Sequence, residues 1–456
     1  MLLNKNIFRA NDIRGVAYED LTEEVITNLG KALGSLTVDS GGNEFLVGRD
    51  GRNSSPDMFK WLTAGITQTG CDVLNIGIVP SPVLYFATHE LNCANGVIIT
   101  GSHNPSEYNG FKIVINGKSL LNSEIQNIKK IIEREESAEG QGLIRDVSVL
   151  EKYQHKIIND INLKRPLRIA IDCGNGAGSV HAKDTFEKLG CEVLDLYCEL
   201  DGNFPNHHPD PSRPENLKDL IDLVLTSNLD IGLAFDGDAD RLGVISPSGE
   251  IIYPDMQMII FSESILNSSP NSKIVFDVKC SNLLSESITK KNGIPIMCKT
   301  GHTFIKEAIR NESALLGGEM SGHIFFADDY FGYDDAIYVA ARIVQTLSRT
   351  DQKLSQLKAE LPKYYSTPEM RLEAESDEEK FRILYNDVDL CLKVREQGYN
   401  IVWTPYVTLI HHGSSSLKKV KQDKKKIEQS RQEVDNMLEK WLPQLAKDPA
   451  YNRSLS

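Results

Sequence analysis

The chain passes from an apolar run into a cluster of turn-forming residues at Gly96-Val97-Ile98-Ile99-Thr100-Gly101-Ser102-His103-Asn104-Pro105. The apolar residues predict a buried strand, and the Gly, Ser, Asn and Pro that follow predict a loop. A second apolar run at 111–115 carries Lys112 near its start. A loop serine becomes a nucleophile when a base or a cation lies beside it, and His103 and Lys112 are candidates for that role. The alternative is a polar turn whose side chains bond only their own backbone.

The alternation of strand and helix recurs along the chain. Apolar runs at 45–50 and 72–77 flank a helical stretch at 58–69, which is the β-α-β pattern of an α/β domain. The pattern restarts twice, and its three openings resemble one another: Val47-Gly48-Arg49-Asp50, Ala170-Ile171-Asp172 and Val275-Phe276-Asp277. This weak internal repeat indicates one α/β unit used three times.

Three glycines follow the second opening, at positions 174, 176 and 178. Their G-x-G-x-G spacing differs from the G-x-G-x-x-G of dinucleotide-binding turns. The next apolar run also ends without the acidic residue that such a site needs. The glycines therefore predict a tight turn between a strand and a helix.

A carboxylate triplet, Asp236, Asp238 and Asp240, follows another apolar run. Three carboxylates at alternate positions repel one another unless a cation lies between them, and oxygen ligands suit Mg²⁺ or Ca²⁺. An EF-hand is excluded because its glycine would fall at Arg241 and its glutamate at Pro247. The alternative is a solvated acidic turn.

Composition argues against three classes of protein: nucleic-acid binders, membrane-spanning proteins and secreted proteins. The net charge is -14, which argues against a general nucleic-acid binder. The sequence has no apolar stretch of the length that spans a membrane, and its N-terminus lacks the apolar core of a secretory signal. The eight cysteines are scattered and form no C-x-x-C pair, so we expect reduced thiols in a cytoplasmic protein. We also expect the protein to be a monomer.

The segment T-G-S-H-N-P-x-x-Y-N-G-x-K that begins at Thr100 resembles the phosphoserine loop of the α-D-phosphohexomutase family, and above all of its bacterial phosphomannomutase/phosphoglucomutase members. The resemblance implies that Ser102 carries a phosphoryl group and interconverts hexose 6-phosphate and hexose 1-phosphate, of mannose or glucose, through a hexose 1,6-bisphosphate. It also implies that Mg²⁺ is held by the carboxylate triplet and the phosphorylated Ser102. Lys112, with His103 or His302 close by, would handle the hydroxyl proton.

Other motifs of the family occur in the same order along the chain. Asn11-Asp12-Ile13-Arg14-Gly15 resembles the segment whose arginine supports the phosphoserine, with Asn11 where the family usually has Tyr. Arg241 would help to hold phosphate. In the segments 299–306 and 316–323, Lys299 and His302 would lie near the transferred phosphate and sugar. The remaining expected substrate contacts are Glu319 and Ser321, on the O3 and O4 hydroxyls, and His323 of the same sugar-recognition loop.

The resemblance implies an α/β fold with three consecutive similar domains, built of mixed sheets with flanking helices around a central cleft. An atypical segment takes the place of the usual fourth domain. We expect boundaries of 1–148 for the phosphoserine domain, 149–252 for the metal-loop domain, 253–362 for the sugar-recognition domain and 363–383 for the start of a fourth domain, followed by a tail at 384–456.

The tail at 384–456 differs from the rest of the chain. It holds 12 Lys and Arg against nine Asp and Glu. It resembles the C-terminal part of family-2-type nucleotide-sugar glycosyltransferases, where Asp387 would take the catalytic position; the alternative is a carboxylate at a helix N-terminus. The D-x-D half of such a transferase is missing from the chain, so the tail is not expected to act as a transferase by itself.

No segment close to R-x-S-N-T-x-P, the family's clamp on the distal phosphate, occurs downstream of residue 383. We therefore expect a phosphohexomutase whose activity is reduced. The alternatives are a catalytically impaired fusion protein that binds sugar phosphate, or a protein that associates with a glycosyltransferase through its tail.

Overall fold

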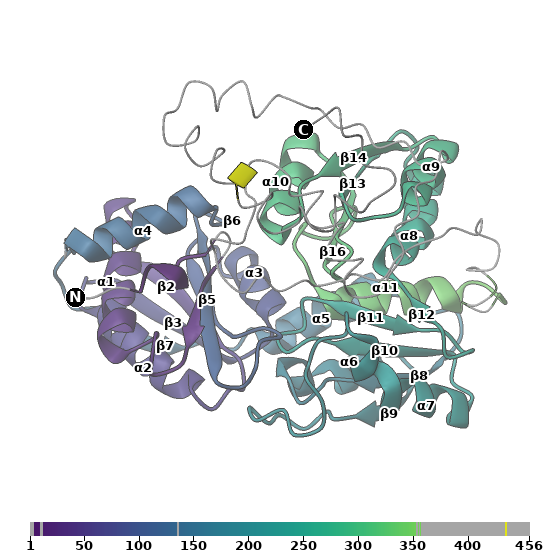
Figure 1. Cartoon of the computed structure of the whole chain (residues 1–456), viewed down its shortest axis with the longest axis horizontal. Helices are drawn as coiled ribbons and strands as arrows, with labels where there is room; N and C mark the ends of the chain where they lie inside the picture. The colour runs from purple at the N-terminus through teal and green to yellow at the C-terminus, as the bar shows by residue number, and fades with distance from the viewer. Residues whose placement is uncertain are drawn as a thin grey trace. The chain divides into compact units, whose positions relative to one another are not determined.

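The computed structural model describes residues 4–9, 12–134 and 136–352, together with the isolated residues 354, 356, 434 and 435. The chain divides into two compact units, Met1–Tyr364 and Tyr365–Ser456. All the helices and strands named below belong to the first unit (Figure 1). The predictions for 363–383 and for the tail lie outside the described residues, apart from 434 and 435.

The first sheet has seven strands in the order β1-β5-β4-β2-β3-β7, with β6 paired to β5. Its strands are β1 (Ile13–Val16), β2 (Glu44–Arg49), β3 (Asp72–Ile78), β4 (Gly96–Ile99), β5 (Tyr108–Ile115), β6 (Lys118–Ser119) and β7 (Ile144–Asp146). β2 runs parallel to β3 and β4, whereas β5 is antiparallel to β1 and β4. The accompanying helices are η1 (Lys5–Ile7), α1 (Glu23–Asp39), α2 (Ser55–Thr67), α3 (Ser81–Glu90), α4 (Asn122–Arg134) and α5 (Leu150–Asp160).

The second sheet has five strands in the order β12-β11-β10-β8-β9. They are β8 (Arg168–Asp172), β9 (Glu192–Leu196), β10 (Ile231–Phe235), β11 (Leu242–Ile245) and β12 (Ile251–Ile252). β8, β9 and β10 run parallel, and β11 turns back antiparallel to β10. The helices of this part are η2 (Ala177–Val180), α6 (Ala182–Lys188), η3 (Pro214–Leu217) and α7 (Lys218–Ser227).

The third sheet has four strands in the order β14-β13-β15-β16. They are β13 (Lys273–Asp277), β14 (Ile294–Cys298), β15 (Leu316–Gly318) and β16 (Ile324–Phe326), and only the pairing of β15 with β16 is antiparallel. Its helices are α8 (Pro254–Ser268), α9 (Asn282–Lys290), α10 (His302–Glu312) and α11 (Ala336–Ser348).

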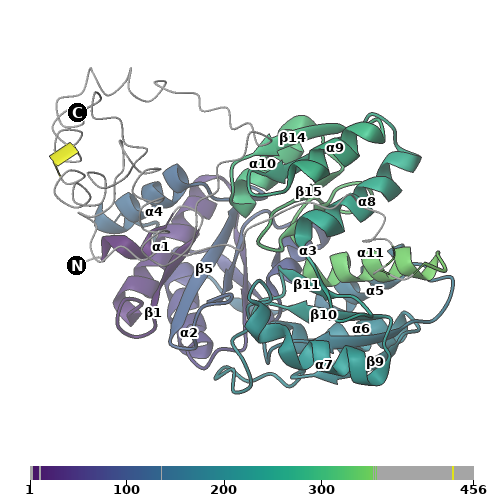
Figure 2. The same ribbon diagram turned by 45° about the vertical axis from the view of Figure 1, so that its right-hand side comes forward.

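Each sheet carries helices on both faces, because successive side chains of a buried strand point to opposite faces. In the first sheet, Phe45 and Val47 pack with α1, α2 and α4, while Leu46 faces α3 and α5. The core on the Leu46 side continues without a break through the second and third sheets to α11. Figures 1 and 2 show the three layered parts in chain order, from purple through teal to green. The prediction of three similar α/β domains with mixed sheets is confirmed; their predicted boundaries stay predictions.

Two local predictions can be compared with the structure. The helix predicted at 58–69 is observed as α2, Ser55–Thr67, and the predicted start is wrong by three residues because Pro56 fits the first turn of a helix. The tight turn predicted from the glycines after β8 is confirmed, with Gly174 at φ +49° and η2 following directly. Within the described residues, no helix combines the length and apolar character needed to cross a bilayer.

One connection recurs in all three domains. A central parallel strand turns back into an antiparallel neighbour through the loops β4–β5, β10–β11 and β15–β16. The parallel strand beside each of these pairs ends next to a buried aspartate, namely Asp50, Asp172 or Asp277. The three turn-back loops carry Ser102, the carboxylate triplet and the Glu319–His323 segment, so the repeated fold places the three predicted site segments at equivalent positions.

Candidate active site

Ser102 lies in the β4–β5 loop, in the left-handed region at φ +50°. Its amide donates to the Thr100 hydroxyl at 2.9 Å, and the amide of Gly101 donates to Asp50 at 3.2 Å. A loop at the end of a strand commonly lies at the surface, but Ser102 is only 2% exposed. The second domain covers it: a Cβ added at Gly237 would lie 2.2 Å from the Ser102 carbonyl oxygen.

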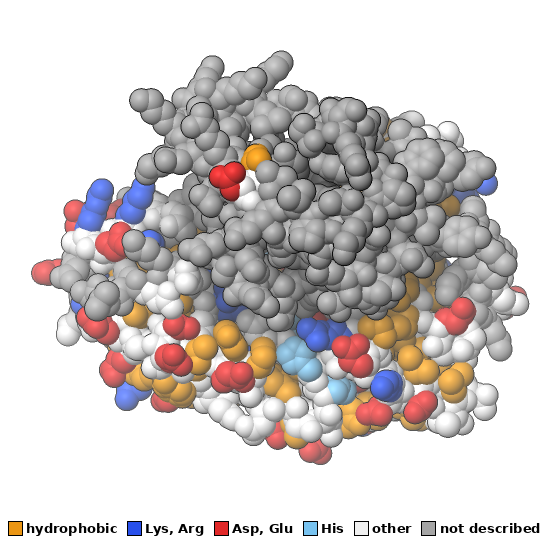
Figure 3. All heavy atoms as spheres, in the orientation of Figure 1, with side chains coloured by type: hydrophobic (Ala, Val, Ile, Leu, Met, Phe, Trp, Pro, Cys, Tyr) orange, Lys and Arg blue, Asp and Glu red, His pale blue; other side chains and the backbone are white. Residues whose placement is uncertain are grey.

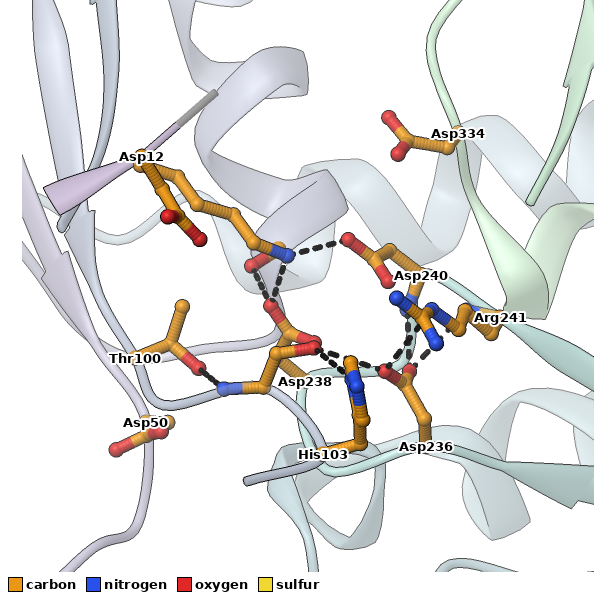
Figure 4. Close-up of polar contacts among 12 residues, drawn as sticks. Asp12, Asp50, Thr100, His103, Asp236, Asp238, Asp240, Arg241 and Asp334 are labelled. Carbon is orange, nitrogen blue, oxygen red and sulfur yellow. Dashed lines mark hydrogen bonds and ion pairs between the residues drawn. The ribbon is translucent and has the colours of Figure 1, made fainter. Parts of the chain in front are cut away.

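The Ser102 hydroxyl faces two groups that can act on its proton (Figure 4). Its Oγ lies 3.1 Å from Nδ1 of His103 and donates to Oδ2 of Asp236 at 3.1 Å. Burial, with the positive charges of Arg241 and Arg14, holds the pKa of His103 well below its usual value. The imidazole is therefore neutral at physiological pH, and Nδ1 next to Ser102 can donate or accept a hydrogen bond, depending on the tautomer.

The carboxylates of Asp236, Asp238 and Asp240 meet in the β10–β11 loop. All three residues are 0% exposed, and one oxygen of each lies within 4.8 Å of the others. Burial, then the charges of Asp240 and Asp238, raises the pKa of Asp236 well above its usual value. A solvated acidic turn is thereby excluded, since water does not screen these charges. The side chains meet because Ala239 adopts φ +55° and turns the loop sharply.

Lys112 partly neutralises the carboxylate triplet from the first domain. β5 carries its Nζ to 2.5 Å from Oδ2 of both Asp238 and Asp240. Burial lowers the pKa of Lys112, but the two carboxylates outweigh burial and raise it well above its usual value. The ammonium is thus held protonated, and its predicted role in proton transfer stays a prediction. Ser81, at the start of α3, also hydrogen-bonds Asp238.

A divalent cation with oxygen ligands fits this triplet. The Oδ1 atoms of Asp238 and Asp240 are buried without a hydrogen-bond partner among the described residues. Buried carboxylate oxygens with free lone pairs are the ligands that Mg²⁺ and Ca²⁺ prefer. The donor set includes no sulfur and no nitrogen in this loop, which disfavours softer metals.

Two arginines lie beside the Ser102 loop. Arg14 belongs to β1, pairs with Gly110 of β5 and holds Asp12 at 2.5 Å. Arg241 follows the triplet; its Nε donates to Nε2 of His323 at 2.9 Å and lies 4.0 Å from Asp236. Burial lowers the pKa of Arg241, but Asp236 and Asp240 outweigh burial and raise it. The Arg241 guanidinium therefore remains charged, as a phosphate contact requires.

The β15–β16 loop reaches the triplet through His323. Nδ1 of His323 lies 3.0 Å from Asp334 and 3.5 Å from Asp240. In the same loop, the Ser321 hydroxyl donates to Glu319 at 3.1 Å, and the other Glu319 oxygen accepts from the Gly301 amide. The predicted segments 299–306 and 316–323 therefore meet, as a shared role in binding requires.

His302 stands at the start of α10 with its ring stacked on His323, the centroids 5.5 Å apart. Burial and the charge of Lys306 hold the pKa of His302 well below its usual value. Lys299 differs from the other predicted site residues because it is exposed, and its ammonium lies 5.6 Å from the centroid of the Phe304 ring.

Sequence reasoning missed several buried polar residues of the site. Asp334 is 0% exposed and lies 2.7 Å from the Lys306 ammonium. An acidic pair before an apolar helical run marks its neighbour Asp335 as a helix cap, and Asp335 does accept from the first amides of α11. Nothing local marks Asp334 itself, or Arg52 and Ser81, because most of their partners lie far away in the sequence.

The chain matches three consecutive family profiles. They are described as Phosphoglucomutase/phosphomannomutase, alpha/beta/alpha domain I at residues 5–139, domain II at 151–249 and domain III at 253–365. These ranges take in all three turn-back loops.

Curated relatives match over most of their length. A phosphomannomutase/phosphoglucomutase of Pseudomonas aeruginosa is 47% identical over 382 residues, which cover 84% of this chain and 82% of the relative. A phosphoglucomutase of Neisseria gonorrhoeae is 45% identical over 372 residues, 81% of each chain.

Solved structures agree with these relatives. A phosphoglucomutase/phosphomannomutase family protein of Burkholderia thailandensis superposes with a TM-score of 0.78 at 41% identity, covering 80% of this chain and 82% of that one. The resemblance predicted from the motifs is confirmed for the three α/β domains, whereas the likeness of the tail to a glycosyltransferase stays a prediction. The chain belongs to the phosphoglucomutase/phosphomannomutase family, whose members are phosphohexomutase isomerases.

Proposed function

We propose that this chain interconverts hexose 6-phosphate and hexose 1-phosphate, of mannose or glucose, by lending a phosphoryl group from Ser102. The observation that carries the proposal is the meeting of the Ser102 hydroxyl with Asp236 and His103, each at 3.1 Å, beside two further buried carboxylates and two arginines. A buried serine between a neutral imidazole and a cation site is suited to phosphoryl transfer.

The proposed reaction has two transfers. In the first, the phosphoryl group leaves Oγ of phosphorylated Ser102 and bonds to the free hydroxyl oxygen of the hexose phosphate, giving a hexose 1,6-bisphosphate. The hydroxyl proton leaves the sugar, and Oγ of Ser102 ends protonated. In the second, the other phosphoryl group returns to Ser102 and its sugar oxygen regains a proton. His103 or His302, with Lys112, would carry these protons.

The carboxylate triplet is proposed to hold Mg²⁺. Asp236, Asp238 and Asp240 would supply the oxygen ligands, together with an oxygen of phosphorylated Ser102. Mg²⁺ bound here would neutralise the negative charge that develops during phosphoryl transfer. The proposal of a metal site is supported by the buried Oδ1 atoms of Asp238 and Asp240, which have no hydrogen-bond partner among the described residues.

The remaining roles concern binding. Arg14 and Arg241 would hold phosphate, because each is charged and adjoins the Ser102 loop. Glu319 and Ser321 would bind adjacent sugar hydroxyls, and their mutual hydrogen bond keeps both side chains ordered before substrate arrives. His323 would bind substrate at the junction of the two loops. Lys299, which is exposed, would meet the substrate from the rim of the site.

The test is the site of phosphorylation. After incubation with glucose 1,6-bisphosphate and Mg²⁺, intact-mass analysis should show one added phosphoryl group on the wild type and none on Ser102→Ala. Ser106→Ala, an exposed serine of the same loop, is the matched control and should accept the group normally. Phosphate that maps to Ser106 or Ser321, or a fully active Ser102→Ala, would contradict the proposal.

A further inference from the structure

Arg52 is among the largest fully buried side chains of the described residues, with 2% of the residue exposed. It lies between β2 and α2, and its side chain extends into the β4–β5 loop. A buried guanidinium is costly unless each of its N–H groups finds an acceptor. Its partners are therefore informative about what the residue does.

The two terminal nitrogens of Arg52 bind four carbonyl oxygens of the Ser102 loop. Nη2 donates to the carbonyls of Ser102 at 2.7 Å and Asn104 at 2.6 Å. Nη1 donates to the carbonyls of Pro105 at 2.6 Å and Tyr108 at 2.9 Å. One planar group thus ties together the whole turn from the nucleophile to the start of β5.

The turn is shaped around this guanidinium. A Cβ added at Gly101 would lie 2.5 Å from both Cζ and Nε of Arg52, so only glycine fits there. Ser102 itself is held at φ +50°, a conformation that a residue with a side chain keeps only when its surroundings enforce it. Its carbonyl, bound by Nη2, is also the atom against which Gly237 of the metal loop packs.

The guanidinium is fixed from two further sides. Nε lies 3.2 Å from Oδ2 of Asp50, the same oxygen that accepts from the Gly101 amide. The Phe204 ring of the second domain lies over Cζ, 4.9 Å from centroid to carbon. Arg52 is therefore enclosed by both domains and has no open side for a substrate.

We propose that Arg52 is a positioning residue that holds Ser102 in its reactive conformation and sets the spacing between the Ser102 loop and the carboxylate triplet. The inference rests on the proposed function only for its catalytic consequence; the control of loop geometry does not depend on it. A lysine cannot replace Arg52, because one ammonium has three donors at a point and cannot serve four carbonyls arranged around a planar fork.

The experiment compares Arg52→Lys with Arg342→Lys. Arg342 is the matched control: its guanidinium pairs with Asp328 at 2.6 Å and lies 4.1 Å from the centroid of the Phe326 ring. Two measurements are made on each protein. One is amide hydrogen exchange over residues 100–110, and the other is the single-turnover rate at which Ser102 takes a phosphoryl group from glucose 1,6-bisphosphate.

For Arg52→Lys we expect faster exchange confined to 100–110 and a rate of phosphoryl transfer lower by about 10²-fold, since small displacements of a reacting group cost that much. Arg342→Lys should leave both unchanged relative to the wild type. Gly101→Ala should displace the guanidinium and so give the same faster exchange over 100–110 and the same slower phosphoryl transfer as Arg52→Lys. If Arg52→Lys does not fold, Gly101→Ala is measured in its place.

Unchanged exchange at 100–110, or a change spread over the chain as general destabilisation would give, overturns the role of Arg52. If the wild type accepts no phosphoryl group, the proposed function fails, and the exchange measurement still decides whether Arg52 holds the loop.

Discussion

Lys112 and the triplet show how a single residue decides the chemistry of its neighbours. Three carboxylates that are 0% exposed would be strongly destabilising on their own. The ammonium of Lys112, 2.5 Å from Asp238 and Asp240, offsets part of that cost. Because Asp236 lies farther from this cation and keeps a raised pKa, the triplet retains attraction for a second positive charge.

Asp238→Asn should weaken Mg²⁺ binding and lower turnover while the fold stays intact. Asparagine keeps the shape but removes one of three negative charges, and affinity for a hard divalent cation follows the ligand charge; we expect a loss of roughly tenfold or more. Titration of Mg²⁺ against turnover measures it. Asp210→Asn is the control, because Asp210 is also buried, at 2%, but bonds Ser212 and Arg213 outside the triplet. Equal Mg²⁺ dependence in both variants and the wild type would show that the triplet does not bind the ion.

At the scale of elements, two of the three turn-back loops are held by an aspartate at the end of the adjacent parallel strand. Asp50, directly after β2, accepts from the Gly101 amide at 3.2 Å. Asp277, at the end of β13, accepts from the Met320 amide at 3.3 Å. Asp172 instead accepts from Gly174 and pairs with His207 at 3.0 Å. The same strand end thus supports the nucleophile loop in one domain and the sugar-recognition loop in another.

The junction of α5 and α6 contains a histidine with a clear effect on stability. His181 is 4% exposed and stacks on Tyr153 at 5.1 Å, and neither of its ring nitrogens has a hydrogen-bond partner among the described residues. Burial lowers the pKa of His181 to about 4. The unfolded chain therefore takes up the proton first, and the stability of the native fold falls as the pH drops from about 6.5 to about 4.

His181→Phe should remove that acid sensitivity. The ring stacking is kept and the unsatisfied polar atoms are lost, so stability at pH 7 should be equal or higher, by about 1 kcal/mol. Between pH 6.5 and 4 the variant should lose about 3 kcal/mol less than the wild type. Urea unfolding across this range measures it.

Two features allow the effect of His181 to be separated from that of other titratable groups. Asp335, whose pKa burial raises to about 6, acts in the opposite direction in both proteins, so the difference between them isolates His181. His155→Gln, at an exposed position of α5, should behave as the wild type. A variant as acid-sensitive as the wild type would contradict the assignment.

At the scale of the whole molecule, one continuous core joins the three domains from Leu46 of β2 to Leu347 of α11. The site is built where their turn-back loops meet. Figures 1 and 2 show the ribbons of the three domains, coloured from purple through teal to green. The visible described part of the surface mixes acidic, basic and apolar side chains, with histidine and a basic side chain near the middle of the face (Figure 3). No broad basic area of the kind that nucleic acid needs is seen on that part of the face.

The tail leads to a prediction for the reaction as a whole. No R-x-S-N-T-x-P segment occurs downstream of residue 383. If nothing else in the chain replaces it, two charge-assisted hydrogen bonds to the distal phosphate would be lost, at roughly 1.5–3 kcal/mol each. We expect Ser102 to accept a phosphoryl group normally, but kcat/KM to be lower by about 10²- to 10⁴-fold, with a raised KM and release of the bisphosphate intermediate.

A coupled assay with and without added hexose bisphosphate measures this loss. The comparison is a chimera that carries the fourth domain of a relative after Phe381. Equal rates for the chain and the chimera would show that residues 384–456 supply a clamp of their own.

The sequence by itself determined the elements and the local chemistry. The buried strands, the Ser102 loop and the carboxylate triplet could be predicted because each depends on residues within a few positions of one another, where apolar periodicity and turn chemistry act. The three similar strand segments that end in Asp50, Asp172 and Asp277 likewise predicted three copies of one domain.

Only the tertiary structure decided which of these pieces touch. Lys112 and Asp238 are 126 residues apart, Arg52 and Asn104 are 52 apart, and Arg241 and His323 are 82 apart. No local pattern encodes such pairs, because they arise from the packing of distant loops, within one domain for Arg52 and Asn104 and between domains for the other two. The same packing buries Ser102, which a strand-end loop alone would leave in water, and burial is the main cause of the raised pKa of Asp236 and the lowered pKa of His103 beside it.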